Sequence, residues 1–254
     1  DVYKRQAYAL YHARVYDELV SLKSLEKEKA EFMRILVHEL RAPVGASKSM
    51  AAALRFVNRD DDNLNMVLGR IEGRMEGLLA LVDDILDLSQ IKAGRPLGDI
   101  AVHDLAAKTR SDCEPYREQA EAQGLVLSLD LPAAPLPVRI DLQAYQLILS
   151  NLVSNALKYT PAGSVQVRLR RAVPWAVLEV EDTGMGIPEA DVSHLFTEFY
   201  RASNARRSQI PGSGVGLAGV KELVERFDGE MELASEEGRG STFTVRLPLH
   251  VGEE

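Results

Sequence analysis

The stretch FMRILVHELRAPVGA, Phe32–Ala46, reads as an amphipathic helix with a histidine outside its apolar series. Apolar or small residues recur here and beyond at alternating steps of four and three: Met33, Val37, Leu40, Val44, Ser47, Ala51 and Leu54. This heptad period is typical of helices that pack at a shallow angle. His38 lies on a row of polar residues instead, so the pattern predicts that its imidazole faces solvent.

A second helix with the same period follows after a short polar segment, Val57–Asn63. Its apolar positions are Leu64, Leu68, Ile71, Met75, Leu78, Val82 and Ile85. Two such helices predict an antiparallel hairpin. Each helix also carries a second apolar stripe, formed by Phe32, Leu36 and Met50 in the first and by Val67, Leu79 and Leu86 in the second. Two hairpins would bury both stripes, so we predict a homodimeric four-helix bundle over residues 31–93.

The residues before this hairpin divide into two parts. Residues 7–30 are predicted as a signalling helix, and apolar residues at Val15, Leu19, Leu22 and Leu25 permit a coiled coil, although Lys29 weakens the pattern. Residues 1–6, DVYKRQ, can be back-translated into the end of a transposon-based sequencing adaptor, so we interpret them as an artefact. No apolar run approaches the about 18 residues that span a bilayer. Membrane attachment is expected only through an upstream segment.

Composition limits the possible functions. The 254 residues are 46% hydrophobic, which allows a sizeable core, and the net charge of −8 argues against general affinity for nucleic acid. The single cysteine, Cys113, excludes an internal disulfide and agrees with a reducing compartment.

The pattern changes after a Gly- and Pro-containing linker, residues 94–99. Over residues 100–254 the sequence predicts helices at about 102–123, 141–159 and 215–227, with Asp141 as an N-cap. Strands are predicted at 125–131, 138–140, 164–170, 175–181, 230–235 and 241–249. Helices and strands without strict alternation predict an α/β sandwich, with one helical layer on a mixed sheet. The predicted fold class is therefore α followed by α/β.

Three polar or glycine-rich motifs of this second part point to a phosphate-bearing ligand. Asn151 and Asn155 share one face of a predicted helix, and amide oxygens suit Mg²⁺. The segment DTGMGI, Asp182–Ile187, follows a strand, and its glycines allow close approach of the backbone to a ligand. The segment GSGVGLAGV, Gly212–Val220, opens a helix whose N-terminal amides suit an anion. No GxxxxGK[ST] loop occurs, which excludes a Walker-type site.

The segment HELRAP, His38–Pro43, resembles the phosphoacceptor box of sensor histidine kinases, and the resemblance extends over nearly the whole chain from about Lys23. It implies that His38 attacks the γ-phosphate of ATP and that Glu39 acts as base. Many members carry Thr or Asn four residues after the histidine for dephosphorylation of the partner. Here that residue is Ala42, so the kinase activity is expected while the phosphatase activity is in doubt.

The order of the later motifs is similar to that of the histidine-kinase catalytic domain, whose ATP-binding Bergerat-type fold is shared with DNA gyrase. The resemblance implies that Asn155 and Asn151 serve Mg²⁺, that Asp182 binds the adenine amine and that residues 200–211 form a mobile lid. Phe196, Phe199 and Arg201 correspond to the phenylalanine box. The full set of implied nucleotide-binding residues is Asn151, Asn155, Lys158, Tyr159, Asp182, Gly184, Gly186, Ile187, Phe199, Arg201, Gly212, Gly214, Gly216 and Leu217.

The resemblance implies ATP and Mg²⁺ as cofactors, and a homodimer and a response-regulator receiver domain as partners. It further implies a cytoplasmic portion of a bacterial protein, in which an upstream segment would supply any anchor in the inner membrane. Two alternatives stay open: a hydrolytic ATPase of the same fold and a catalytically silent dimeric adaptor. Hydrolytic relatives place a water-activating glutamate four residues before the metal-binding asparagine, where this chain has Asn151. The sequence leaves open whether phosphorylation runs within a subunit or across the dimer.

Overall fold

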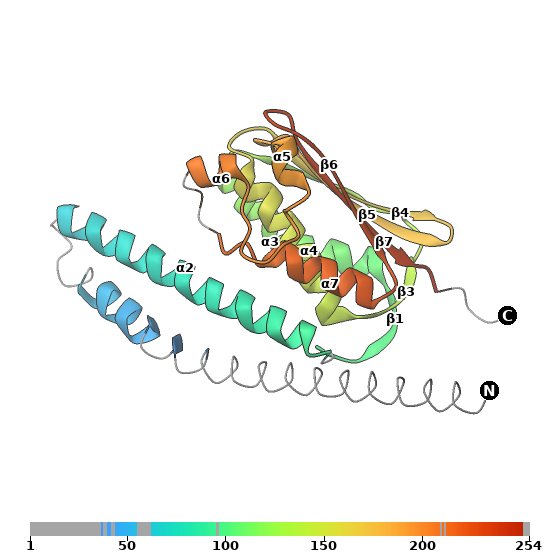
Figure 1. Cartoon of the computed structure of the whole chain (residues 1–254), viewed down its shortest axis with the longest axis horizontal. Coiled ribbons are helices and arrows are strands. Elements are labelled where there is room, and N and C mark those ends of the chain that lie inside the picture. The colour runs from blue at the N-terminus through green and yellow to red at the C-terminus, as the bar shows by residue number, and fades with distance from the viewer. Residues whose placement is uncertain are drawn as a thin grey trace, which may run out of the picture. The chain divides into compact units, whose positions relative to one another are not determined.

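The computed structural model describes residues 37, 40–41, 44–54, 62–94, 97–208, 210 and 212–250. It divides into two compact units, Asp1–Arg95 and Pro96–Glu254, which are shown in Figure 1. The division falls inside the predicted linker, residues 94–99. The predicted helix at 7–30 and the artefact at 1–6 lie outside the described residues. No helix of the described ranges is both long and apolar enough to cross a bilayer.

The first unit contains two helical segments that pack on each other, residues 44–54 and α2 (Asp62–Lys92). The heptad positions fall into two sets spaced by seven residues. One set is buried or half-buried, namely Val37, Val44, Ala51, Leu68, Met75 and Val82. In the other set, Leu40, Leu54, Ile71 and Leu78 remain 37–50% exposed in this single chain. One helical hairpin therefore leaves part of its apolar seam open.

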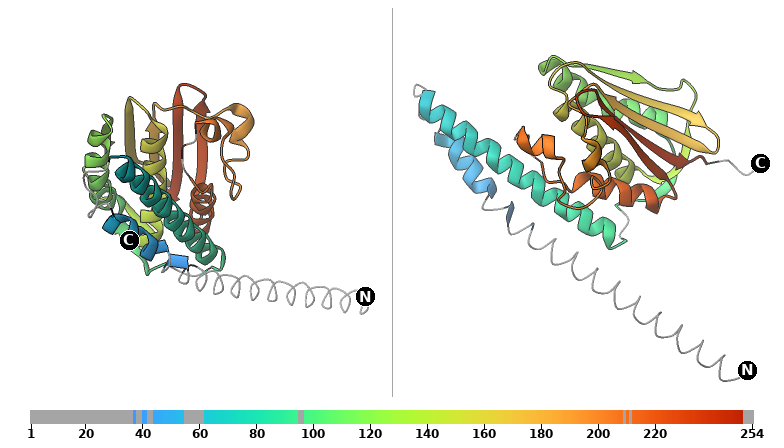
Figure 2. Two further views of the ribbon diagram at one scale, coloured as in Figure 1. Left: turned by 90° about the vertical axis from the view of Figure 1, so that its left-hand side faces the viewer. Right: turned by 45° about the horizontal axis from the view of Figure 1, so that its top comes forward.

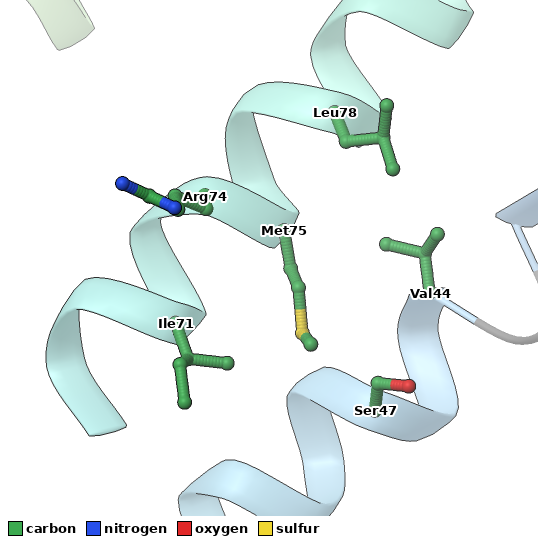
Figure 3. Close-up of a pocket in the computed structure, with 6 residues that line it drawn as sticks. All are labelled: Val44, Ser47, Ile71, Arg74, Met75 and Leu78. Carbon is green, nitrogen blue, oxygen red and sulfur yellow. The ribbon is translucent and has the colours of Figure 1, made fainter. Parts of the chain in front are cut away.

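Figure 3 shows the seam between the two helices, where Val44 and Ser47 face Ile71, Met75 and Leu78 around an open hollow of about 380 Å³. Two ion pairs flank this seam. Lys48 Nζ lies 2.6 Å from Glu76 Oε1, and Arg41 pairs with Asp83.

The second unit is the predicted α/β sandwich (Figure 1). Its elements, in chain order, are β1 (Ile100–Asp104), α3 (Leu105–Ala122), β2 (Val126–Asp130), β3 (Pro137–Asp141), α4 (Leu142–Tyr159), β4 (Ser164–Ala172), β5 (Trp175–Asp182), α5 (Glu189–Val192), α6 (Ser203–Arg207), α7 (Gly216–Arg226), β6 (Glu230–Glu236) and β7 (Gly240–Pro248).

A five-stranded sheet of order β2-β4-β5-β7-β6 forms one layer of this unit. Strands β2 and β4 are parallel and the other neighbours are antiparallel, so the sheet is mixed as predicted. Helices α3, α4 and α7 lie together on one face of the sheet (Figure 2). Inward-facing residues of β4 and β5 are fully buried, among them Val165, Val167 and Val180. The opposite face carries charged side chains, and Arg168 lies 2.7 Å from Glu181 there.

One prediction about this unit is wrong at its start. Residues 102–104 were expected within a helix, but they belong to β1, which pairs antiparallel with β3. Helix α3 begins at Leu105 because Asp104 caps it, with Oδ1 accepting from the amide of Ala106 at 3.0 Å. Ile100 and Val102 on β1 are both exposed, so β1 does not show the alternation of buried and exposed residues that is typical of a half-buried strand. The two-stranded pairing is set by β3, far along the chain.

Helix α4 is anchored at both its start and its buried face. Asp141 caps it as predicted, with Oδ1 accepting from the amide of Gln143 at 2.8 Å. Tyr145, fully buried, donates from its hydroxyl to Thr109 Oγ1 of α3 at 2.5 Å, while Thr109 donates to the carbonyl of Leu105 at 2.6 Å. These bonds fix the helix that carries Asn151 and Asn155.

Candidate nucleotide-binding site

A buried carboxylate lies at the carboxyl end of β5, the central strand of the sheet. Asp182 is 7% exposed, and its Oδ1 accepts from the amide of Gly184 at 2.8 Å. Burial raises the pKa of Asp182 to about 6, although the amides of Gly184 and Ser241 oppose the shift. A carboxylate held in this way suits a neutral or cationic N–H donor of a ligand.

Glycine is required at position 184 because the chain crosses α4 closely there. A Cβ on Gly184 would lie 2.4 Å from the carbonyl oxygen of Tyr159 and 2.8 Å from Thr160 Oγ1. The amide of Met185 donates to the same Tyr159 carbonyl at 3.0 Å. The DxGxG segment is thus attached to the end of α4. The absence of a side chain at Gly184 permits this close approach of the two backbones.

The polar face of α4 carries the paired amides. Asn151 and Asn155, four residues apart, are both half-buried, and Lys158 on the next turn is exposed. Asn151 points at the first turn of α7, because a Cβ on Gly216 would lie 1.9 Å from its Oδ1. The glycine motif of α7 and the asparagine motif of α4 therefore meet, as the sequence predicted for one site. Leu217 lies in the same turn of α7.

Cationic side chains converge at Gly212. A Cβ there would lie 2.9 Å from Lys158 Nζ, 3.5 Å from the Tyr159 hydroxyl and 3.8 Å from Arg201 Nε. Lys158 Nζ also lies 5.3 Å from the centre of the Tyr159 ring. Tyr159, one of the implied nucleotide-binding residues, thus turns its hydroxyl toward the two cations. Two neighbouring positive charges favour a polyanionic ligand.

Gly186 and Ile187 are fixed by residues that the sequence patterns did not single out. Gly186 adopts φ +58°, and its carbonyl accepts from Asn204 Nδ2 at 2.9 Å. The amide of Ile187 donates to Ser235 Oγ of β6 at 2.9 Å. Asn204 is buried, so it ties α6 to the DxGxG segment.

The phenylalanine-box segment packs on the second glycine motif. Phe199 is 60% exposed and has φ +61°, a conformation that is uncommon for a large side chain. Gly214, with φ +73°, passes so close that a Cβ on it would lie 2.8 Å from the Phe199 carbonyl carbon and 2.6 Å from the Tyr200 oxygen. The ring centre of Phe196, the first residue of the box, lies 5.7 Å from Lys221 Nζ of α7.

The lid expected at residues 200–211 is partly regular. Residues 203–207 form α6 and not a loop, which corrects the prediction for that part. Asp191 of α5 holds its start, accepting from the Tyr200 hydroxyl at 2.6 Å and from the amide and hydroxyl of Ser203 at 2.7 Å each. These three donors lower the pKa of Asp191 to about 2.

The other half of the predicted chemistry lies in the first unit. His38, Glu39 and Ala42 lie outside the described residues. Arg41, which belongs to the phosphoacceptor box, pairs with Asp83 of α2. Its charge is therefore partly compensated within the hairpin.

The residues of the second unit fit a nucleotide with a magnesium ion. Arg201 Nε is buried and has no hydrogen-bond acceptor among the described residues. The carboxamide oxygens of Asn151 and Asn155 are hard donors of the kind that Mg²⁺ takes alongside phosphate and water. The described part of the chain holds no cluster of three or more His, Cys, Asp or Glu side chains suited to a metal ion. A metal here would accordingly depend on the amides and on the phosphates.

Comparison with known proteins gives a family match for each of the two units. Residues 28–94 match the family model of the His Kinase A (phospho-acceptor) domain. Residues 140–251 match the model of the histidine kinase-, DNA gyrase B-, and HSP90-like ATPase. The two matched domains, in this order, define the chain as the core of a sensor histidine kinase, and it belongs to that family.

Individual relatives give the same result. The chain is 35% identical over 240 residues to the circadian input-output histidine kinase CikA of Synechococcus elongatus, covering 91% of this chain and 31% of CikA. It is 30% identical over 248 residues to the sensor histidine kinase WalK of Bacillus subtilis, covering 95% of this chain and 40% of WalK. It thus spans well under half the length of either relative.

A solved structure supports the fold. The crystal structure of full-length ShkA in complex with AMPPNP aligns with a TM-score of 0.69 at 22% identity, covering 88% of this chain and 47% of ShkA.

Proposed function

We propose that this protein transfers the γ-phosphoryl group of ATP to its own His38 and then to an aspartate of a response-regulator receiver domain. The observation that carries the proposal is the meeting of Asn151 with Gly216 beside the cations at Gly212, on a chain that also has the phosphoacceptor box. Asp182, the buried first residue of the DxGxG segment, would accept a hydrogen bond from the adenine amine.

In the proposed reaction a ring nitrogen of His38 attacks the γ-phosphorus. A nitrogen–phosphorus bond forms, the bond from phosphorus to the β,γ-bridging oxygen breaks, and ADP leaves with that electron pair. Glu39 accepts or orients the proton of the imidazole. The nucleotide-binding residues contribute chiefly by positioning and by charge neutralisation, as is usual in phosphoryl transfer. Asn155 and Asn151 would hold Mg²⁺, which supplies charge neutralisation at the phosphates.

Dimerisation and location belong to the same proposal. Exposed apolar side chains on the hairpin, such as Met50 at 68% and Val67 at 50%, support a second hairpin packing on the first. Because ATP and receiver domains are cytoplasmic in bacteria, we place this core on the cytoplasmic side, with any membrane anchor in a segment upstream of it.

The hydrolytic alternative has less support, because Asn151 takes the place of a water-activating glutamate. The silent adaptor has less support because the glycine motifs and Asp182 keep their positions around α4.

Partition of label from γ-³²P-ATP tests the three functions together. If the protein is a kinase, label should appear on the protein. A purified receiver domain should then accept the labelled phosphoryl group on its own aspartate. Free phosphate that appears without any labelled protein would favour the hydrolase. Absence of nucleotide binding would favour the adaptor.

A further inference from the structure

Asp191 lies outside every sequence motif of the site, yet its carboxylate accepts three hydrogen bonds. It is 7% exposed, and Oδ1 accepts from the Tyr200 hydroxyl at 2.6 Å. Oδ2 accepts from both the amide and the hydroxyl of Ser203 at 2.7 Å. These donors lower its pKa to about 2, so the carboxylate is ionised at every pH at which the kinase would be assayed. Hydrogen bonds to a charged acceptor are among the stronger ones in proteins.

The two residues that Asp191 holds lie on either side of Arg201. Tyr200 precedes Arg201 and Ser203 follows it by two positions, so both ends of the short segment are fixed to one carboxylate. The Tyr200 ring also lies 5.4 Å from the ring of His194. The aromatic ring thus has a contact of its own, apart from the hydroxyl bond to Asp191.

The turn before Arg201 is strained and needs such support. Phe199 has φ +61°, which costs a non-glycine residue free energy unless its surroundings hold it. The backbone of Gly214 packs directly on Phe199 and Tyr200. The Asp191–Tyr200 bond therefore opposes relaxation of the turn on which the second glycine motif rests.

Arg201 connects this support to the phosphate-binding side of the site. Its guanidinium donates to the carbonyl of Ile210, and its Nε is buried without an acceptor within the described residues. The same Nε lies beside Gly212, where Lys158 Nζ also arrives. The ammonium group of Lys158 and the guanidinium group of Arg201 repel each other when both lie beside Gly212. Contacts that fix the segment carrying Arg201 would therefore offset this repulsion and keep the guanidinium beside Gly212.

We propose that Asp191 is a positioning residue for the nucleotide phosphates: through Tyr200 and Ser203 it holds Arg201 beside Lys158 and Gly212. The inference rests on the proposed function, in which Arg201 contacts the nucleotide. It adds a residue of α5 that touches no nucleotide itself and acts only through Arg201.

A double-mutant cycle on the full chain tests this proposal. The variants are Tyr200→Phe, which keeps the ring and removes the hydroxyl, Arg201→Ala, and the two together. Affinity for AMPPNP with Mg²⁺ is measured by titration calorimetry, and folding is checked by thermal unfolding. Tyr116→Phe is the matched control, because it also removes a hydroxyl bond, to Ser150, from a half-buried tyrosine that belongs to α3 and to none of the nucleotide-binding motifs.

The proposal predicts that Tyr200→Phe weakens AMPPNP binding roughly tenfold, which corresponds to loss of one charge-assisted hydrogen bond. In the Arg201→Ala background the same change should have an effect of about twofold or less, because Tyr200 acts through Arg201. Tyr116→Phe should leave affinity unchanged. If Tyr200→Phe unfolds the protein, Ser203→Ala replaces it, with a smaller effect and the same dependence on Arg201.

Two outcomes would overturn the inference alone: unchanged affinity in Tyr200→Phe, or an equal loss with and without Arg201, which is the result of general loosening. Full affinity in Arg201→Ala would instead remove Arg201 from the proposed nucleotide site, and the role of Asp191 with it.

Discussion

Asn151 of α4 and Gly216 of α7 approach so closely that a methyl group on the glycine would overlap the asparagine side chain, 1.9 Å from Oδ1. The obstructing atom is the end of a side chain that can rotate, so the fold would tolerate an alanine there. The orientation of Asn151 would not survive. The contact therefore joins the magnesium-type ligand to the glycine motif, and this orientation of Asn151 requires glycine at position 216.

We expect Gly216→Ala to lower affinity for Mg²⁺-ATP roughly tenfold, the loss of one well-placed polar ligand, while thermal stability changes little. Gly73→Ala on α2 is the matched control, because nothing lies within 4 Å of the added methyl group and alanine favours a helix. The two variants are compared by titration calorimetry and by thermal unfolding. Equal affinities would separate Asn151 from the site.

The raised pKa of Asp182 predicts a pH dependence of nucleotide binding. Burial favours the protonated carboxyl and raises its pKa to about 6 in the free protein, whereas an adenine amine requires the ionised form as acceptor. Affinity should therefore rise with pH through about 6 and level off above it, by at most about tenfold per pH unit.

Asp182→Asn is the control for this prediction, because it removes the titration of this carboxyl group and leaves that of the nucleotide phosphates. Binding by the variant should be weaker, with a flatter dependence on pH. Parallel pH profiles of the two proteins, measured by calorimetry between pH 5 and 8, would show that Asp182 does not bind the base.

The bond between Tyr145 and Thr109 predicts an effect on stability alone. Thr109→Val keeps the shape of the side chain but leaves the buried Tyr145 hydroxyl without its acceptor. We expect a loss of about 1–3 kcal/mol in the free energy of unfolding, measured with urea. Thr109→Ser, which keeps the hydroxyl, should lose less. A Val variant as stable as the wild type would mean that the hydroxyl finds another partner.

The second apolar stripe of the hairpin includes Met50, which is exposed in the single chain. We therefore predict that a charge at Met50 weakens the dimer. A glutamate there would be buried against the second hairpin, so Met50→Glu should raise the dimer dissociation constant at least about tenfold in sedimentation velocity. Ser49→Glu adds the same charge one position away, at an exposed residue outside the heptad series. Identical behaviour of both variants would place the interface elsewhere.

Sequence reasoning succeeded where periodicity or local chemistry decides structure. It found α2, α4 and α7, the Asp141 cap and six strands, β2 to β7, and it predicted that the asparagine motif lies near the second glycine motif, as the approach of Asn151 to Gly216 shows. These residues belong to motifs whose backbone requirements can be read locally.

It could not find residues that act through the tertiary fold. Asp191, Asn204 and Ser235 have no motif, and their partners lie on other elements. Strand β1 was missed because its pairing with β3, not its own pattern, makes it a strand. A hydrogen-bonding side chain next to a recognised motif was the available signal for Asp191 and Asn204, and it is a weak one.

The central claim is that His38 receives phosphorus from a nucleotide bound in the second unit. The direct measurement is incubation of the wild type, His38→Gln and Asp182→Asn with γ-³²P-ATP, with the acid and alkali stability of the protein label recorded and AMPPNP binding measured in parallel. We expect acid-labile, alkali-stable label on the wild type, none on His38→Gln despite normal AMPPNP affinity, and little on Asp182→Asn. Undiminished label on His38→Gln would contradict it.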